Sequence, residues 1–435
     1  MSSSKKSINL FGTCSRAPDA ATALLQDQAL VQIFAAIDRD GDETRIVGGA
    51  LRNALFGRPV HEIDLATTAA PEIVMARAKA AGLRCIPTGL AHGTVTLLVE
   101  GKTFETTSLR EDVETDGRRA KVRFGRDFET DALRRDFTMN ALFMARDGRL
   151  FDYAGGLDDI AAKKVRFIGE PVRRIREDYL RILRFFRFSA EFGEGPLDPA
   201  GLEAALRERE GLASLSRERV RAEILKLFCA RRAVEVSEEI CWAGLLGPLL
   251  ASAPNPARLR RLAAIAPSQP QDPLLRLAAL CLDLPEDAER LRERLRLSNA
   301  EFKRLERAAI AHMEQHGRED PPKPDELLRL LFRHGRTAAL DAAFLAQAEA
   351  RAPHADEWDI ARGFLHDAAE PRLPFSGADL TARGVTEGRA IGDALRRLES
   401  LWISAGFPDD PRRLAELLDD AVNQSKRSIA QGEAG

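Results

Sequence analysis

The stretch that decides the fold reads Arg45-Ile-Val-Gly-Gly-Ala-Leu-Arg-Asn-Ala-Leu-Phe-Gly57, and His61-Glu-Ile-Asp-Leu-Ala-Thr-Thr68 follows it closely. The first part has the pattern of a strand, a Gly-Gly turn and a helix over 50–56. Backbone N–H groups at such a turn and the positive end of a helix favour an anion. Arg52 lies early in this helix, where its guanidinium could clamp a triphosphate. Taken alone, a Gly-Gly turn before a helix is more often only a turn.

The second part predicts two carboxylates on one side of a strand. Side chains alternate along a strand, so Glu62 and Asp64 point to the same face with Cα atoms about 7 Å apart. Carboxylates at this separation can share Mg²⁺ ions that clamp an attacking hydroxyl and a leaving pyrophosphate. A solvent-facing acidic pair on an edge strand is the alternative, and the pair alone does not exclude it.

A third acid strengthens the functional interpretation. Glu105 lies in the middle of Phe104-Glu-Thr-Thr-Ser-Leu109, where a carboxylate has poor strand propensity. This strand and 94–99 alternate across Glu100-Gly101 and predict a hairpin. If the strand of Glu105 lies beside that of Glu62 and Asp64, the three carboxylates form one site.

Basic, acidic and amide groups also crowd the segment 131–140, ahead of a second predicted hairpin over 142–152 with Asp147-Gly148 at its tip. After Pro171, long Leu/Ala/Arg/Glu-rich stretches with apolar residues every three or four positions predict helices almost to the end. The sequence therefore predicts a mixed α/β head followed by an all-helical extension.

Composition places few further limits. The chain has 435 residues, 65 Lys and Arg against 67 Asp and Glu, and five scattered cysteines. A net charge of −2 argues against a generic nucleic-acid coat but allows a local basic surface. No apolar run is long enough for a membrane span, and the start lacks the apolar core of a signal peptide. Unpaired cysteines are typical of a cytoplasmic protein.

Five motifs in order carry a resemblance to a known family: Gly48-Gly-Ala-Leu-Arg52 with Glu62-Ile-Asp64, Phe104-Glu-Thr-Thr-Ser-Leu-Arg110, Arg134-Arg-Asp-Phe-Thr-Met-Asn-Ala141, Glu177-Asp-Tyr-Leu-Arg-Ile-Leu-Arg-Phe-Phe-Arg-Phe188, and Leu215-Ser-Arg-Glu-Arg-Val-Arg-Ala-Glu-Ile-Leu-Lys226. They resemble the class II CCA-adding enzymes and poly(A) polymerases. The resemblance implies a Mg²⁺-dependent tRNA nucleotidyltransferase that adds C and A residues to the tRNA 3′ end from CTP and ATP without a nucleic-acid template.

The resemblance also implies a role for each matching residue. It makes Glu62 and Asp64 the metal ligands and, with Glu105 as the third acid that helps to activate the RNA 3′-hydroxyl, the catalytic residues. It assigns nucleotide binding to a larger set: Gly48, Gly49, Arg52, Arg135, Asp136, Asn140, Asp178, Arg181, Arg184 and Arg187.

The implied fold is α+β: a polymerase-β-like nucleotidyltransferase head, then an elongated all-helical neck, body and tail. The expected boundaries are a disordered segment over 1–20, the head over 21–165, the neck over 166–235, the body over 236–320, the tail over 321–425 and a disordered end over 426–435.

The sequence departs from the usual family pattern at two positions, and three activities share this pattern. Glu62 and Asn53 stand where the family usually has Asp, and an inactive metal site would leave a catalytically weak RNA-binding protein. The segment 110–124 resembles a flexible loop that family members need for adding A. Residues 88–96 resemble the corresponding segment of CCA-adding enzymes more than that of bacterial poly(A) polymerases. The chain lacks a strongly basic C-terminal tail, which disfavours a poly(A) polymerase. A-only addition stays open.

The segment 174–188 predicts one amphipathic helix whose buried stripe holds Ile175, Tyr179, Ile182 and Phe186. At about 100° per residue, Asp178 and Arg181 would lie only about 60° apart and could address one pocket. A carboxylate only accepts and a guanidinium only donates, which matches the edges of cytosine and adenine and repels uracil and guanine. A surface ion pair is the alternative.

The helical extension would bind a tRNA stem by shape and phosphate contacts. Candidate contacts are Arg258, Arg260, Arg261, Lys303 and Arg304. A His366-Asp367 pair resembles part of a phosphohydrolase metal motif, but the other six histidines are dispersed, so a surface pair on a helix is the better interpretation.

Overall fold

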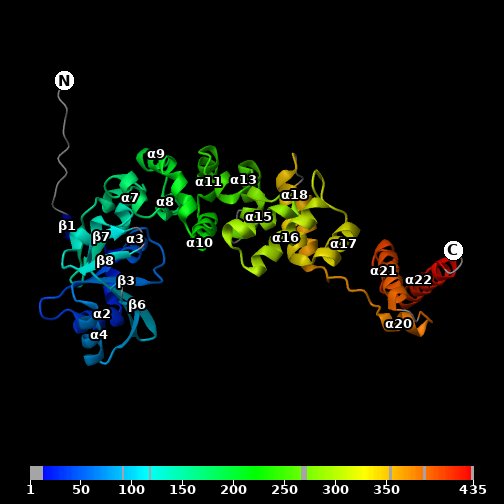
Figure 1. The fold of residues 1–435 in the computed structure, drawn as a ribbon, viewed down its shortest axis with the longest axis horizontal. Coiled ribbons are helices and arrows are strands. Elements are labelled where there is room, and N and C mark those ends of the chain that lie inside the picture. Colours follow the sequence, from blue (N-terminus) through cyan, green and yellow to red (C-terminus); the bar gives the residue numbers. More distant parts are fainter. Residues whose placement is uncertain are drawn as a thin grey trace, which may run out of the picture. The chain divides into compact units, whose positions relative to one another are not determined.

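The computed structural model describes residues 13–90, 93–116, 119–265, 272–351, 355–385 and 388–432, with the backbone alone described for 111–116, 119–123 and 426–432. It divides into two compact units, one ending at Leu245 and the other beginning at Leu246. Strands lie in the blue and cyan part of the chain, and helices make up the rest (Figure 1). The predicted class, an α/β head with a helical remainder, is confirmed.

An eight-stranded mixed sheet forms the head, with strand order β1-β10-β9-β2-β3-β6-β5-β4. Its strands are β1 (Thr13–Arg16), β2 (Thr44–Val47), β3 (Ile63–Thr67), β4 (Arg84–Gly89), β5 (Thr94–Val99), β6 (Lys102–Ser108), β9 (Leu142–Ala145) and β10 (Arg149–Asp152). The strands β3 and β6 pair in parallel, whereas every other described pair in this sheet is antiparallel.

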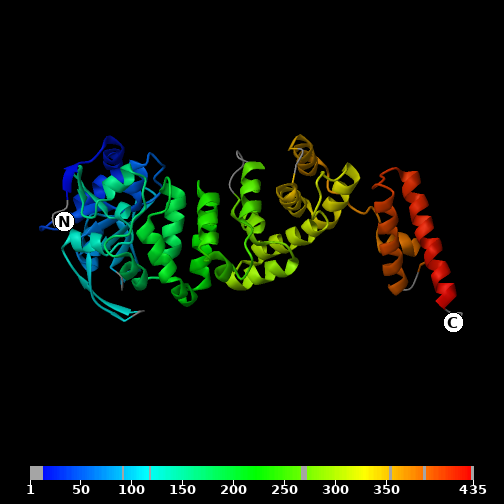
Figure 2. The ribbon, with the colours of Figure 1, turned by 90° about the horizontal axis from the view of Figure 1, so that it is seen from above.

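Both predicted hairpins are present. The β5–β6 turn has φ of 51° at Glu100 and 75° at Gly101, and two positive φ values match the right-handed twist of the paired strands. The hairpin β9–β10 turns at Asp147-Gly148. The segment 110–124, expected to be a loop, instead forms the two-stranded hairpin β7 (Arg110–Asp116) and β8 (Arg119–Phe124), which extends as a narrow cyan ribbon in Figure 2.

Helices cover the sheet and continue beyond it within the first unit. They are α1 (Asp19–Thr22), α2 (Gln28–Ile37), α3 (Gly49–Leu55), α4 (Pro71–Ala80), α5 (Phe128–Leu133), α6 (Gly156–Ala161), α7 (Pro171–Glu177), α8 (Leu180–Phe192), α9 (Pro199–Arg207), α10 (Arg217–Phe228) and α11 (Ala233–Trp242), with short 3₁₀ turns at Ala23–Gln26, Thr138–Asn140 and Arg209–Ser214. A buried cluster that includes Val47, Ala66 and Phe143 packs the central strands against α5.

Four sequence predictions need correction. The disordered N-terminal segment is wrong for 13–20, because β1 pairs with β10 and α1 follows; residues 1–12 lie outside the described part. The disordered end is wrong for the backbone of 426–432, where the last helix continues to Gly432, and 433–435 lie outside the described part. The flexible loop is a hairpin. The helix predicted over 174–188 is two helices, because Asp178 takes an extended conformation with φ −157° and ψ 106°.

The second unit is helical throughout its described residues. Its helices are α12 (Leu246–Leu250), α13 (Pro256–Ile265), α14 (Pro273–Cys281), α15 (Pro285–Leu295), α16 (Asn299–Met313), α17 (Pro324–His334), α18 (Arg336–Glu349), α19 (Ala355–Asp367), α20 (Gly377–Ala382), α21 (Gly388–Ser404) and α22 (Pro411–Gly432). One core cluster centres on Trp358 and another on Trp402.

The helices of both units were considered as possible membrane spans by their length and apolar character. Among the described helices, none is long and apolar enough to cross a membrane by itself. The segments Asp19–Gln26 and Gln28–Ile37 meet the criteria of length and composition only when they are joined across a 76° bend.

Candidate active site

Three carboxylates converge at the β3–β6 pair. Asp64 on β3 lies directly opposite Glu105 on β6 in the parallel ladder, so both side chains project from the same face of the sheet. Glu62 lies two residues before Asp64, just ahead of β3, and all three side chains are exposed. The structure therefore brings together the three acids that the sequence singled out.

The charges of these acids affect one another. Burial raises the pKa of Asp64, the negative charges of Glu105 and Glu62 raise it further, and the positive charge of Arg135 opposes them. Asp64 remains solvent-accessible, although protein atoms crowd around it. Within the described residues, no hydrogen bond or ion pair engages any of the three carboxylates. Unpaired carboxylates of this kind have the oxygen ligands that hard divalent cations take.

The Gly-Gly turn lies beside the acids, because β2 pairs with β3 and places Val47 opposite Asp64. Gly48 has φ of 71° and ψ of −122° and precedes the seven-residue helix α3. A Cβ at Gly48 would lie 3.4 Å from Nη1 of Arg135. The positive φ favours glycine there, whereas the contact with the guanidinium is an ordinary one. The turn can thus approach a ligand through its backbone.

Arg52 on α3 is held by neutral groups. Its Nη1 donates to Oδ1 of Asn140 at 2.6 Å, and its Nη2 donates to Oδ1 of Asn53 at 2.9 Å. The guanidinium carbon lies 4.9 and 4.3 Å from the ring centroids of Phe188 and Phe192. Burial lowers its pKa to about 10, so Arg52 stays protonated at neutral pH. No carboxylate bonds to it within the described residues, which leaves its charge available to an anion.

Asp136 connects the residues around Arg52. Its Oδ1 accepts from the backbone N–H of Phe137 at 2.8 Å and from Nδ2 of Asn140 at 2.9 Å, and Nε of Arg184 donates to Oδ2 at 2.8 Å. Burial would raise the pKa of Asp136, but the Arg184 charge and these hydrogen bonds outweigh it and hold the pKa below its ordinary value. Asp136 therefore orients Asn140, which in turn orients Arg52.

Arg135 and Arg187 are each bonded to an acidic side chain. Arg135 donates to Oδ2 of Asp131 from Nη2 at 3.0 Å and lies over the ring of Phe143. Arg187 donates from Nε to Glu223 at 2.5 Å, and its guanidinium covers the ring of Phe188. Arg184, Arg187 and Arg52 lie around one ring, because their guanidinium carbons are 5.3, 4.2 and 4.9 Å from the ring centroid of Phe188.

Asp178 and Arg181 do not share one helix face as the sequence predicted. Asp178 lies at the break between α7 and α8, where Nη2 of Arg219 donates to its Oδ2 at 2.7 Å. Arg181 donates to Glu177 at 2.7 Å and to the backbone oxygens of Arg174 and Arg134 at 2.9 and 3.3 Å. The two side chains do not form the i,i+3 ion pair that was the alternative.

Several residues of this neighbourhood were not selected from the sequence. Arg219 and Glu223 lie in the fifth motif on α10, and each bonds a residue that was selected. Phe188 and Phe192 supply the aromatic faces around Arg52. Phe188 could have been found, since it ends the fourth motif, but a phenylalanine in an amphipathic helix is usually core.

The predicted tRNA contacts of the second unit are partly wrong. Arg258 is fully buried, and Arg304 is bound to Asp341 and Asp272, so neither guanidinium is free for phosphate. Nε of Arg261 donates to the backbone oxygen of Ala348. Lys303 is exposed. The interpretation of His366 and Asp367 as a surface pair is confirmed, since they bond each other at 2.6 Å with both side chains exposed.

Known proteins identify the family. A family model described as the poly A polymerase head domain matches residues 44–166. The CCA tRNA nucleotidyltransferase 1, mitochondrial, of Danio rerio is 35% identical over 394 residues, which cover 86% of this chain and 86% of the relative. The chain belongs to the CCA tRNA nucleotidyltransferase family.

Two further relatives extend the similarity over nearly the whole chain. The CCA-adding enzyme of Lacticaseibacillus paracasei is 29% identical over 393 residues, 89% of this chain and 94% of the relative. The crystal structure of the Bacillus stearothermophilus CCA-adding enzyme in complex with CTP is 27% identical, with a TM-score of 0.70 over 92% of this chain and 98% of that one. The CCA tRNA nucleotidyltransferase family thus accounts for both the head and the helical unit.

Proposed function

We propose that this protein adds C, C and A to the 3′ end of tRNA, using CTP and ATP and no nucleic-acid template. Family membership over 86% of both chains supports the activity. The observation that carries the assignment of the site is the unpaired acid trio of Glu62, Asp64 and Glu105 beside the turn at Gly48. We propose the cytoplasm as its compartment, because none of its five cysteines forms a disulfide in the described structure.

Members of this family work with a divalent metal, and we assign Mg²⁺ to Glu62 and Asp64. The fit rests on the donor set: the carboxylates of Glu62 and Asp64 lie next to a third acid, and no cationic side chain among the described residues bonds to them. Bound Mg²⁺ would neutralise charge that develops on the phosphates. Glu105 accepts the proton of the RNA 3′-hydroxyl. The 3′-oxygen then bonds to the α-phosphorus, and the bond between the α-phosphorus and the departing pyrophosphate breaks.

The triphosphate binds at the Gly48-Gly49 turn and Arg52. Arg52 supports this role because its hydrogen-bond partners are amides and its stacking partners are aromatic rings, so its positive charge is not cancelled. Arg135 lies close to both the turn and Asp64, where its positive charge can attract a phosphate. Asp136, Asn140, Arg184 and Arg187 hold this arrangement by the contacts described above.

We assign selection of the base to Asp178 and Arg181. Each keeps hydrogen-bonding capacity: Asp178 accepts one donor on each oxygen, and Nε of Arg181 donates to none of the described groups. Asp178 would accept from N4 of cytosine or N6 of adenine, and Arg181 would donate to N3 or N1. Uracil and guanine present the opposite pattern and leave both groups unpaired, which costs several kcal/mol by order of magnitude.

The direct test uses tRNA transcripts that end before CCA, after C and after CC, each with Mg²⁺ and CTP, ATP or both. We expect three, two and one additions, stopping at CCA. Extension of the CC-ending transcript alone would make the protein an A-adding enzyme, and a long A ladder would make it a poly(A) polymerase. Binding of tRNA without any addition would leave an RNA-binding protein with an inactive site at Glu62.

A further inference from the structure

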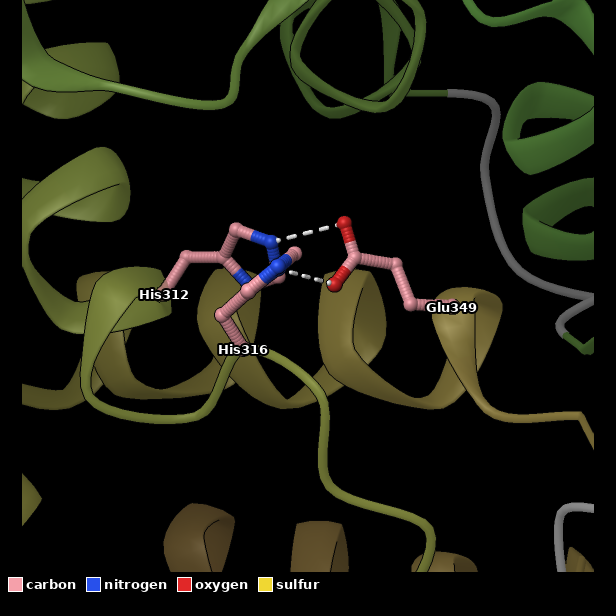
Figure 3. Close-up of side chains that lie close together, drawn as sticks. All are labelled: His312, His316 and Glu349. Atoms are coloured by element: carbon pink, nitrogen blue, oxygen red, sulfur yellow. Dashed lines mark hydrogen bonds and ion pairs between the residues drawn. The ribbon is translucent and has the colours of Figure 1, made fainter.

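Two histidines and a glutamate converge in the second unit, far along the chain from the acid trio. His312 lies in the last turn of α16, His316 follows that helix, and Glu349 is the last residue of α18. The helices α16 and α18 pack against each other. Figure 3 shows the two imidazoles and the carboxylate pointing toward one another. His312 and His316 stand four residues apart, a spacing that can put two ligands on one side of a helix. Glu349 lies 33 residues beyond His316, so the sequence alone did not indicate the trio.

The geometry is that of a ligand set. Nε2 of His312 lies 3.0 Å from Oε1 of Glu349, and Nδ1 of His316 lies 2.9 Å from Oε2. One ligand atom from each residue lies within 4.8 Å of the others. A tetrahedral Zn²⁺ with bonds of about 2.0–2.1 Å requires ligand atoms about 3.3 Å apart. The two His–Glu contacts would open by a few tenths of an ångström around an ion, and any pair at the 4.8 Å limit would close by about 1.5 Å.

We propose that His312, His316 and Glu349 bind a divalent transition-metal cation of the Zn²⁺ class, which ties the ends of α16 and α18 together. Two imidazole nitrogens and one carboxylate favour such a cation over Mg²⁺, which prefers oxygen ligands. The fourth position faces solvent, because the His316 side chain is 71% exposed. The cation is structural and lies outside the nucleotidyl-transfer site.

The surroundings support the ligands. Nη1 of Arg258 holds Oε1 of Glu349 at 2.5 Å, the type of additional hydrogen bond that orients a ligating carboxylate. Arg258 also binds Asp283 at 2.8 Å, so one guanidinium faces two carboxylates and a negative charge is left for the cation. Nδ1 of His312 is buried and bonds to no described group, so Nε2 is the nitrogen that faces the carboxylate and would bind the metal.

The test measures cation binding by the full-length protein in an excess of Mg²⁺, which occupies the head carboxylates. Titration with Co²⁺ followed by absorption, and with Zn²⁺ by calorimetry, is compared with His316→Ala and Glu349→Gln. His366→Ala is the matched control, because this exposed histidine also bonds a carboxylate. Tm is recorded with and without Zn²⁺ for each protein.

We expect one cation per chain, a tetrahedral Co²⁺ spectrum, affinity lower by about tenfold or more in both variants, and a Zn²⁺-dependent rise in Tm that His316→Ala abolishes and His366→Ala keeps. Absence of binding at micromolar Zn²⁺, or equal affinity in His316→Ala and wild type, would overturn the proposal. The contacts would then be a hydrogen-bonded trio only. Neither result depends on tRNA extension, so failure here leaves the proposed function untouched.

Discussion

Two enclosed arginines, one in each unit, are held in opposite ways. Arg258 is fully buried, and its donors are taken by the carboxylates of Asp283 and Glu349 and by three backbone oxygens of α14 and its C-terminal end. Among the described residues, the guanidinium of Arg52 donates only to the side-chain oxygens of Asn53 and Asn140, and it lies against two phenylalanine rings. The first charge is cancelled by carboxylates, and the second is oriented but left uncancelled.

This comparison separates a charged side chain that stabilises the fold, Arg258, from one that is placed to bind a substrate, Arg52. A buried ion is tolerable when opposite charges and hydrogen bonds compensate it. An ion that must attract a triphosphate has to keep its charge, so neutral amides and aromatic faces position it instead. The acid trio follows the same logic, since its three carboxylates have no bonded cation among the described residues.

The largest expected effect on the free energy of unfolding is that of Arg258→Met. Removing this guanidinium leaves Glu349 without its main partner, and breaking a buried ion pair costs about 3–5 kcal/mol. Urea unfolding followed by tryptophan fluorescence is suited to this test, because Trp358 and Trp402 are buried in the same unit. A change below about 1 kcal/mol would mean that Arg258 is not a structural charge.

The second prediction concerns Arg52→Met, with Arg52→Lys as the companion variant. Loss of a charge-assisted contact to phosphate is worth about 1.5–3 kcal/mol, so the KM for CTP and ATP should rise by about 10- to 100-fold. The urea midpoint should stay close to that of wild type. Lysine keeps the positive charge but lacks the planar set of N–H donors of the guanidinium. We therefore expect a KM between those of wild type and Arg52→Met. An unchanged KM in Arg52→Met would remove Arg52 from the triphosphate site.

The third prediction compares two changes at position 62. Glu62→Gln removes a ligand charge and should lower kcat by a factor on the order of 10²–10³. Glu62→Asp keeps the carboxylate and shortens it by one methylene, so activity should stay within about tenfold of wild type. Equal losses in both variants would show that side-chain length matters as much as charge at this position.

The smallest expected effect is a shift in pH dependence. Burial and the charges of Glu105 and Glu62 raise the pKa of Asp64, and the ionised form is the one that binds metal. Activity should therefore fall, as pH decreases, at a higher pH than an isolated aspartate would give. In Glu62→Gln one negative neighbour is gone, so the acid limb of kcat/KM should move to lower pH. A shift to higher pH would contradict the coupling.

Local patterns were enough to predict the acid trio and the hairpins. Alternation and the turn at Glu100-Gly101 fix the strand of Glu105, and the sheet then places it opposite Asp64. The break at Asp178 was not predictable, because Arg219 lies 41 residues away on α10 and bonds the carboxylate there. Helical periodicity continues across the break, so a helical wheel cannot detect it.

The burial of Arg258 could not be predicted from the sequence either. Arg258 lies in the basic run Arg258-Leu-Arg-Arg261, which is typical of a solvated face. Its burial depends on Glu349, 91 residues along the chain, and on backbone oxygens of α14. His312 and His316 are close in the sequence, whereas Glu349 joins them only through the packing of α16 on α18.

The most direct test of the account is single-turnover addition of the first C to a tRNA transcript that ends before CCA, with Asp64→Asn and the control Asp283→Asn beside wild type. Asp64 belongs to the uncompensated acids, and Asp283 pairs with Arg258. We predict that Asp64→Asn loses addition by a factor on the order of 10³ or more, whereas Asp283→Asn adds C at close to the wild-type rate. Comparable rates for Asp64→Asn and wild type would contradict the assignment of the active site.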